Sequence, residues 1–298
     1  MTAPILEDDW TGTDVSIAEI ERELARLRYE SAAESAQPNL RTSVMTHIAW
    51  VPPQWLGVAE ETLAGMAERH PSRTLLLVPH PEAEDGIDAE LSIRCFPVGD
   101  RAVCGEVIEL ALRGSRSQAP ASIVLPLLVS DLPVFCRWRG EPPFGASPFE
   151  QLVDIVDRLV VDTAEWGDTR CAELLELFER TAVSDIAWSR TATWRAELAR
   201  FWPSIREQEI YVRGPRAEAT LLSAWLGARL ARPMRPIEEA LELGVKLGGE
   251  ELAPPHGVQA TPSDLLSAEL DSFARDPVYE EAALAAAASS RGAAPQSR

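Results

Sequence analysis

The stretch "HPSRTLLLVP", residues 70–79, decides the fold of the N-terminal half of this chain. It reads as a strand that is apolar throughout, and such a strand is buried on both faces, as in a parallel sheet. The preceding "RTSVMTHIAWV", residues 41–51, predicts a second strand, and apolar residues at helical spacing from Leu56 to Met66 predict a helix between the two. Strand, helix and strand in this order predict a right-handed βαβ unit.

Further strands follow along the chain. The runs "IDAELSIRCFPV" (87–98) and "AVCGEVIELAL" (102–112) are separated only by a short turn, which predicts an antiparallel hairpin. Another strand is expected from Leu132, and a short one at 160–163 after a helix that begins at Phe149. The chain is therefore predicted to be α/β, with an N-terminal mixed-sheet α/β sandwich followed by a smaller, helix-rich α/β C-terminal domain.

The domain organisation rests on helix signals and on changes in composition. Ser16 and Glu19 have capping-box spacing, which predicts an N-terminal helix. Residues 264–287 read as a helix broken at Pro277, and the Pro- and Gly-rich stretch 233–262 gives no clear pattern. The predicted divisions are an N-terminal helix and linker at 1–40, an α/β domain at 41–168, a helix-rich domain at 169–284 and a disordered tail at 285–298.

Charge and composition exclude several classes of partner. The formal net charge of −19 argues against nucleic-acid binding, which needs clustered Lys and Arg, and it disfavours anionic membrane surfaces. The acidic start has neither a basic region nor an apolar one, so a cytoplasmic protein is expected. The four cysteines show no CxxC spacing and are expected to be free buried thiols, although a regulatory disulfide stays open. The acidic surface favours solubility or a basic protein partner.

Motifs for enzyme chemistry are missing from the sequence. The strand ending at Val51 is followed by "PPQW" where a dinucleotide-binding protein has GxGxxG, and there is no P-loop and no GxSxG elbow. The four histidines are scattered, and His47 lies in an apolar strand pattern typical of a hydrogen-bonded core residue. We therefore predict no catalytic residue, no metal site and no cofactor.

Carboxylates beside tryptophans leave one enzymatic interpretation open. Asp131, Asp162 and Asp185 lie at predicted element boundaries with a tryptophan nearby, an arrangement that a sugar-cleaving site could use. An aspartate at a helix start also accepts backbone N–H bonds as a cap. Asp185, directly before "IAWSR", fits the capping role, which we favour.

Tryptophan and arginine come together twice, in "SDLPVFCRWRG" (130–140) and in "SDIAWSRTATWR" (184–195). Strand alternation places Arg137 and Arg139 on one face and Trp138 on the other. Such residues could bind a carboxylate or phosphate at the end of a strand, or form the hot spot of a protein interface. They could equally stack on each other and form ion pairs that pin the two halves of the chain together.

Several segments, taken in their order along the chain, make it resemble the OpcA family of glucose-6-phosphate dehydrogenase assembly proteins. The resemblance covers about 40–230 and 262–284, and no single motif is as specific as their joint order. The segments that carry it are "RTSVMTHIAWV", "HPSRTLLLVP", "CGEVIELAL", "ASIVLPLLVSDLPVFCRWRG", "LVDIVDRLVVDTAEW", "AVSDIAWSRTATWRAELARFWP", "LLSAWLGARL", "DLLSAEL" and "DPVYEEAAL".

The resemblance implies a non-catalytic partner that binds glucose-6-phosphate dehydrogenase and favours its active oligomer in the oxidative pentose phosphate pathway. It assigns no role to individual residues, so the candidate surface comes from side-chain chemistry. The alternative is a sugar-phosphate-binding protein or enzyme that uses Arg137, Arg139 and the nearby aspartates. The residues expected to form a partner-binding or domain-bridging surface are Arg137, Trp138, Arg139, Asp185, Trp188, Arg190, Trp194 and Arg195.

Overall fold

The structure is a computed structural model in which the chain forms two compact units. Unit 1 comprises Met1–Val160 and Pro262–Phe273, and unit 2 comprises Val161–Thr261 and Ala274–Arg298. The residues that the structure describes are 6–34, 39–40, 43–66, 69–98, 101–167, 171–255 and 260–291. The predicted boundary between 168 and 169 lies outside these residues.

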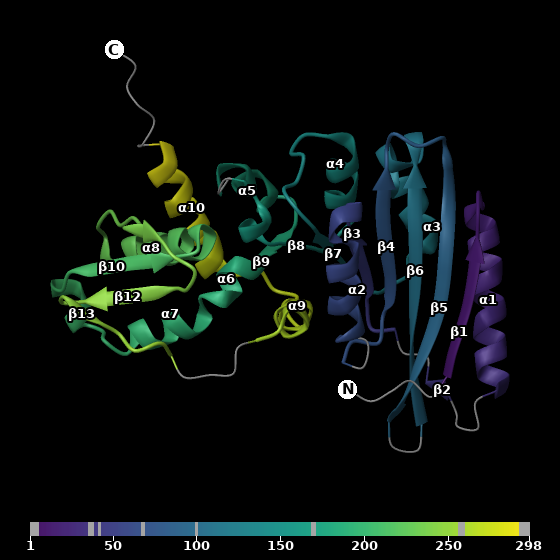
Figure 1. Cartoon of the computed structure of the whole chain (residues 1–298), viewed down its shortest axis with the longest axis horizontal. Helices are drawn as coiled ribbons and strands as arrows, with labels where there is room; N and C mark the ends of the chain where they lie inside the picture. The colour runs from purple at the N-terminus through teal and green to yellow at the C-terminus, as the bar shows by residue number, and fades with distance from the viewer. Residues whose placement is uncertain are drawn as a thin grey trace, which may run out of the picture. The chain divides into compact units, whose positions relative to one another are not determined.

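A mixed sheet forms the centre of unit 1 (Figure 1). Along the sheet the order is β1-β5-β6-β4-β3-β7-β8, and β2 also pairs with β6. Neighbouring strands are parallel from β6 through β4, β3 and β7 to β8. Strand β5 is antiparallel to both of its neighbours, β1 and β6. The strands are β1 (Leu6–Gly12), β2 (Asn39–Leu40), β3 (Thr46–Trp50), β4 (Arg73–His80), β5 (Gly86–Val98), β6 (Arg101–Arg113), β7 (Val134–Trp138) and β8 (Arg158–Val161).

The predicted βαβ unit is present. A short 3-10 turn, η1 (Pro53–Trp55), and helix α2 (Leu56–Ala64) connect β3 to β4, and the two strands pair in parallel. Apolar side chains of α2 pack on one face of these strands, in a cluster of Ala49, Val51, Ala59, Leu76 and Val78. Helix α9 (Pro262–Leu270) contacts α2 on the same side.

Helix α1 (Ile17–Glu34) covers the opposite face, where it contacts β1 and β5. Its start is capped as predicted, because Ser16 Oγ accepts a hydrogen bond from the Glu19 N–H at 3.2 Å. Arg28 on this helix donates two hydrogen bonds to the Glu106 carboxylate of β6. The even-numbered residues of β6 therefore point to the face that α1 covers. The turn η2 (Gly114–Gln118) and helices α3 (Pro120–Leu127) and α4 (Ser147–Val153) complete the helices of unit 1 among the described residues.

Strand β1 is a feature that the sequence analysis missed, since only a helix and a linker were predicted before residue 41. Its sequence, "LEDDWTG", is acidic and lacks an alternating apolar pattern. It pairs with β5 from Leu6 opposite Cys95 to Gly12 opposite Ala89 and lies at the end of the strand order. A charged edge strand of this kind discourages pairing with other chains.

The prediction of four free thiols is wrong for two of the cysteines. Cys95 and Cys104 face each other across the β5–β6 hairpin, with their Cα atoms 4.1 Å apart, and form a disulfide. Directly opposite positions in an antiparallel pair bring side chains close enough for this bond. Cys136 and Cys171 are buried thiols, as expected.

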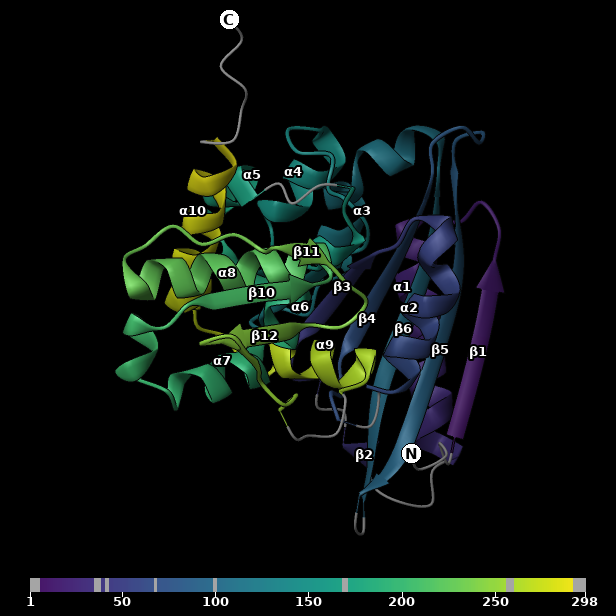
Figure 2. The same cartoon turned by 60° about the vertical axis from the view of Figure 1, so that its left-hand side comes forward.

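Unit 2 combines helices with a small sheet (Figure 2). Its sheet has the strand order β11-β10-β12-β13, and α8 contacts β10. Val212, Leu222 and Val245 are completely buried in its core. The elements of this unit are η3 (Thr163–Glu165), α5 (Cys171–Leu177), β9 (Ala182–Asp185), α6 (Ile186–Arg190), α7 (Ala192–Ala199), η4 (Ser204–Glu207), β10 (Ile210–Gly214), α8 (Arg216–Leu230), β11 (Glu238–Glu239), β12 (Gly244–Leu247), β13 (Glu250–Glu251) and α10 (Pro277–Arg291).

The C-terminal part is more ordered than the sequence indicates. The stretch 233–262, which gave no pattern, contains the short strands β11 to β13, and Gly248 and Gly249 turn the chain between β12 and β13 with φ of 60° and 90°. Pro277 begins α10, where proline is tolerated, and does not interrupt a helix. Helix α10 continues to Arg291, so 285–291 are helical, and 292–298 lie outside the described residues. The part of the chain that the structure describes contains no helix long and apolar enough to span a membrane.

Candidate functional site

Strand β7 holds the first tryptophan–arginine segment inside unit 1. Trp138 stacks on Trp50 of β3, with ring centroids 4.9 Å apart and planes at 10°, and meets Phe149 of α4 edge-on. On the other face, Arg139 donates to Thr62 Oγ1 of α2 at 3.1 Å. The two residues therefore point to opposite faces, as the alternation predicts.

Both arginines of β7 are buried. Arg137 is 1% exposed and donates through its guanidinium to the backbone carbonyl of Trp138, and Arg139 is 8% exposed. A guanidinium that is bonded within its own chain and shielded from water offers little to a phosphate or a carboxylate in solution. The sugar-phosphate interpretation built on these two residues is therefore not favoured.

Asp185 anchors the second segment within unit 2. As the last residue of β9, it caps α6 by accepting a hydrogen bond from the Ala187 N–H at 2.9 Å, which agrees with the capping prediction. Its carboxylate also accepts from the Thr163 N–H at 3.1 Å and the Thr163 hydroxyl at 2.7 Å, and Tyr279 of α10 lies at 3.4 Å. Burial, and then the nearby Asp162, raise the pKa of Asp185 to about 7.

Arg190 forms a bidentate ion pair with Asp162, at 3.0 Å and 2.6 Å, and a third contact at 3.1 Å with Glu218 of α8. The side chains of Asp162 and Glu218 are only 4% and 7% exposed, whereas that of Arg190 is 36% exposed. Asp162 also caps η3 by accepting from the Ala164 N–H at 3.2 Å. These carboxylates are therefore engaged in structural contacts, which argues against the sugar-cleaving interpretation.

The remaining candidate residues, Trp188, Trp194 and Arg195, also make their contacts within unit 2. The Arg195 guanidinium lies 3.6 Å from the centre of the Trp188 ring, and the indole N–H of Trp188 donates to Asp276 at 2.9 Å. Trp194 belongs to the core cluster with Leu198 and Val212. Trp202, which follows Trp194 and Leu198 at helical spacing, is 55% exposed.

The structure thus divides the candidates between the two units, with Arg137, Trp138 and Arg139 in unit 1 and the others in unit 2. Only Arg190 and Arg195 reach solvent, and both only in part. The group as a whole offers little exposed area for a partner. The six buried candidates are Arg137, Trp138, Arg139, Asp185, Trp188 and Trp194.

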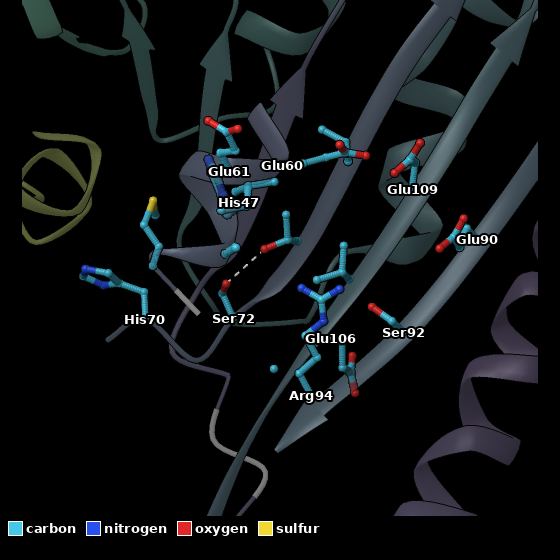
Figure 3. A pocket seen from close by; sticks show the side chains of 17 residues that line it. His47, Glu60, Glu61, His70, Ser72, Glu90, Ser92, Arg94, Glu106 and Glu109 are labelled. Carbon is cyan, nitrogen blue, oxygen red and sulfur yellow. Dashed lines mark hydrogen bonds between the residues drawn. The ribbon is translucent and has the colours of Figure 1, made fainter. Parts of the chain in front are cut away.

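A cavity in unit 1 was not foreseen from the sequence (Figure 3). It measures about 390 Å³ and lies between α2 and the strands β4, β5 and β6. Glu60 of α2, Glu90 of β5 and Glu109 of β6 line it, together with His47 of β3. The signal that could have revealed it is the run of polar side chains at every second position of β5, Asp88, Glu90, Ser92 and Arg94, with apolar residues between them.

His47 is a core residue, as predicted, but its ring nitrogen Nε2 has no hydrogen-bond partner within the described ranges. Burial, and then Arg137, lower the pKa of this histidine to about 3, so the ring is neutral at physiological pH. Over the same ranges, no group of three or more His, Cys, Asp and Glu residues is arranged to hold a metal ion.

Comparisons with known proteins found a matching family model and several similar proteins. Residues 64–178 match the family model described as glucose-6-phosphate dehydrogenase subunit N-terminal domain. The proteins named "Putative OxPP cycle protein OpcA" of Synechocystis sp. (strain ATCC 27184 / PCC 6803 / Kazusa) and Nostoc punctiforme (strain ATCC 29133 / PCC 73102) are 25% and 27% identical to it, over 198 and 183 residues. These alignments cover 60% and 55% of this chain.

The protein of the same name from Synechococcus elongatus (strain ATCC 33912 / PCC 7942 / FACHB-805) is 28% identical over 184 residues, which are 55% of this chain. The chain spans about two fifths of the length of these relatives, at 41%, 39% and 41%. No solved structure matches it at a significant level. The matches confirm the resemblance inferred from the sequence: the chain is similar to the OpcA proteins, and its residues 64–178 match the family model.

Proposed function

We propose that this chain is a non-catalytic assembly factor and allosteric activator. It binds glucose-6-phosphate dehydrogenase in the cytoplasm, favours the active oligomer of that enzyme and so supports the oxidative pentose phosphate pathway. The observation that carries the proposal is the family match over residues 64–178, which includes strands β4 to β8 of the unit 1 sheet. The burial of Arg137, Arg139 and Asp185 in contacts of their own units fits a protein whose candidate polar groups serve its fold.

Activation by binding requires only a difference in affinity. If the chain binds the active oligomer better than the inactive form, the population shifts by the ratio of the two affinities. A preference of about 5.5 kcal/mol moves an equilibrium from 1:99 to 99:1. No group on this chain needs to enter the chemistry of glucose-6-phosphate oxidation.

The test is a rate measurement with purified proteins. Oxidation of glucose-6-phosphate by the dehydrogenase is followed with and without this chain, and this chain is assayed alone. Stimulation of the dehydrogenase without turnover by the chain alone supports the proposal. Turnover by the chain alone, or an unchanged rate of the dehydrogenase together with a failure to bind it, would contradict it.

A further inference from the structure

The unit 1 sheet has one well-covered face and one partly open face. Along β6 the even-numbered residues on the α1 side, such as Ile108, Leu110 and Leu112, are completely buried. The odd-numbered residues between them, such as Val107 and Glu109, are only half-buried. Helix α2 packs over β3 and β4, and the cavity begins where that cover ends.

Three glutamates gather at this open face. Glu90 and Glu109 stand directly opposite each other on β5 and β6, and Glu60 reaches toward them from α2 (Figure 3). None of them forms an ion pair with another described residue. Like charges directly opposite across a sheet repel each other, and burial together with Glu60 and Glu90 raises the pKa of Glu109. A positive group placed among them would relieve this repulsion.

A second observation in the same cavity also points to a ligand. His47 is 1% exposed and lines the cavity, and its Nε2 atom has no hydrogen-bond partner within the described part of the chain. A buried polar atom without a partner is costly, so a group that enters the cavity and bonds to it gains free energy. Because the imidazole is neutral, it does not repel a cation.

The other walls fit the stem of a long basic side chain. Leu63 of α2, Leu76 of β4 and Val107 of β6 line the cavity with apolar atoms. The methylene groups of a lysine or arginine pack on such a surface while the charged end reaches carboxylates. Arg94 of β5 also lines the cavity, on the same face of the strand as Glu90. Glu106 points to the α1 side, where it pairs with Arg28 and Arg73.

We propose that this cavity is the docking site for a basic segment of the partner protein, with Glu60, Glu90 and Glu109 receiving its lysine or arginine side chains and His47 bonding to a polar group of the same segment. The inference rests on the proposed function, because the partner is taken to be glucose-6-phosphate dehydrogenase. The charge of the site specifies a basic patch on that enzyme, and charge complementarity of this kind governs the rate of association and its salt dependence.

The test compares two triple variants of the whole chain. E60Q/E90Q/E109Q removes the three charges and keeps the size of the side chains. E21Q/E176Q/E179Q removes three exposed charges of α1, α5 and the residues after α5, and serves as the matched control. Affinity for the dehydrogenase is measured by biolayer interferometry at low and at physiological salt, and circular dichroism checks that both variants fold.

We expect the first variant to bind about tenfold more weakly or worse, with a smaller dependence on salt, and the control to bind as the wild type does. The single charge reversal E90K, at an exposed position, weakens binding in the same direction. Equal affinities for the wild type and for both E60Q/E90Q/E109Q and E90K would overturn this inference and leave the proposed function intact. A wild-type chain that fails to bind the dehydrogenase at all would overturn both.

A small cation is the other possible occupant. Spermidine binding is measured by isothermal titration calorimetry on the wild type and on E60Q/E90Q/E109Q. If the wild type alone binds spermidine while both proteins bind the dehydrogenase equally, the cavity takes a free cation and the docking proposal is wrong.

Discussion

Arg190 is the candidate whose structural role is most open to measurement. In R190A the carboxylates of Asp162 and Glu218, 4% and 7% exposed, lose their positive partner. Removing one partner of a fully buried ion pair costs about 3–5 kcal/mol, whereas an exposed pair is worth about 0–1 kcal/mol. Because the Arg190 side chain is 36% exposed, the expected loss lies between these limits, at about 2–3 kcal/mol of unfolding free energy.

Urea unfolding followed by circular dichroism measures this loss. R200A is the control, since Arg200 is 76% exposed and pairs with Glu197 on the surface, and it should change stability by less than about 1 kcal/mol. In a second step, D162N placed in the R190A background should recover part of the loss, because a neutral amide is cheaper to bury than an unpaired carboxylate. If R190A is no less stable than R200A, or if D162N recovers nothing, the ion pair is not the reason for the position of Arg190.

Three further predictions follow from named contacts. W138A removes the stack on Trp50 and the edge contact with Phe149, so it should lower unfolding free energy by about 3–5 kcal/mol, and a stable variant that has lost only partner binding would contradict this. C95S/C104S should be about 2–3 kcal/mol less stable than the oxidised wild type, as a short closed loop implies, and equal urea midpoints would speak against the bond. The pKa of Asp185 is raised to about 7, so the folded state holds the proton more tightly than the unfolded chain and wild-type stability should fall as the pH rises from about 4 to 7, by up to about 1.4 kcal/mol per pH unit. D185N should lack that decline. If the stability of the two proteins changes with pH in the same way, the raised pKa of Asp185 is refuted.

The parts of the fold that sequence reasoning predicted are those in which local pattern and tertiary environment agree. The apolar run at 75–78 lies in β4, between two strands that pair with it in parallel, and the apolar spacing of α2 matches the face that it buries. Asp185 could be assigned as a cap because capping depends only on residues next to it in the chain.

The parts that were missed depend on contacts distant in sequence. Strand β1 is acidic and is held in place by pairing with β5, which no local pattern in "LEDDWTG" reveals. The disulfide depends on the register of the β5–β6 hairpin, since it requires Cys95 and Cys104 to be directly opposite. Composition cannot supply that register.

For the candidate site, the sequence predicted only that successive residues of β7 point to opposite faces of the sheet. Strand geometry correctly put Arg139 and Trp138 on opposite faces, but the burial of Arg137 follows from the layers around β7, which lie far away in sequence. Tryptophan and arginine are common in interfaces and in cores alike, so their residue types alone could not separate the two. The cavity between α2 and β6 escaped notice because Glu60, Glu90 and Glu109 come from three different elements.

The central claim is that this chain acts by binding glucose-6-phosphate dehydrogenase and favouring its active assembly. Sedimentation velocity on the two purified proteins, alone and mixed at physiological salt, with the rate of glucose-6-phosphate oxidation recorded on the same samples, tests it most directly. The account predicts a faster-sedimenting complex that contains both proteins and a higher rate per dehydrogenase subunit. Two independent boundaries and an unchanged rate would contradict it.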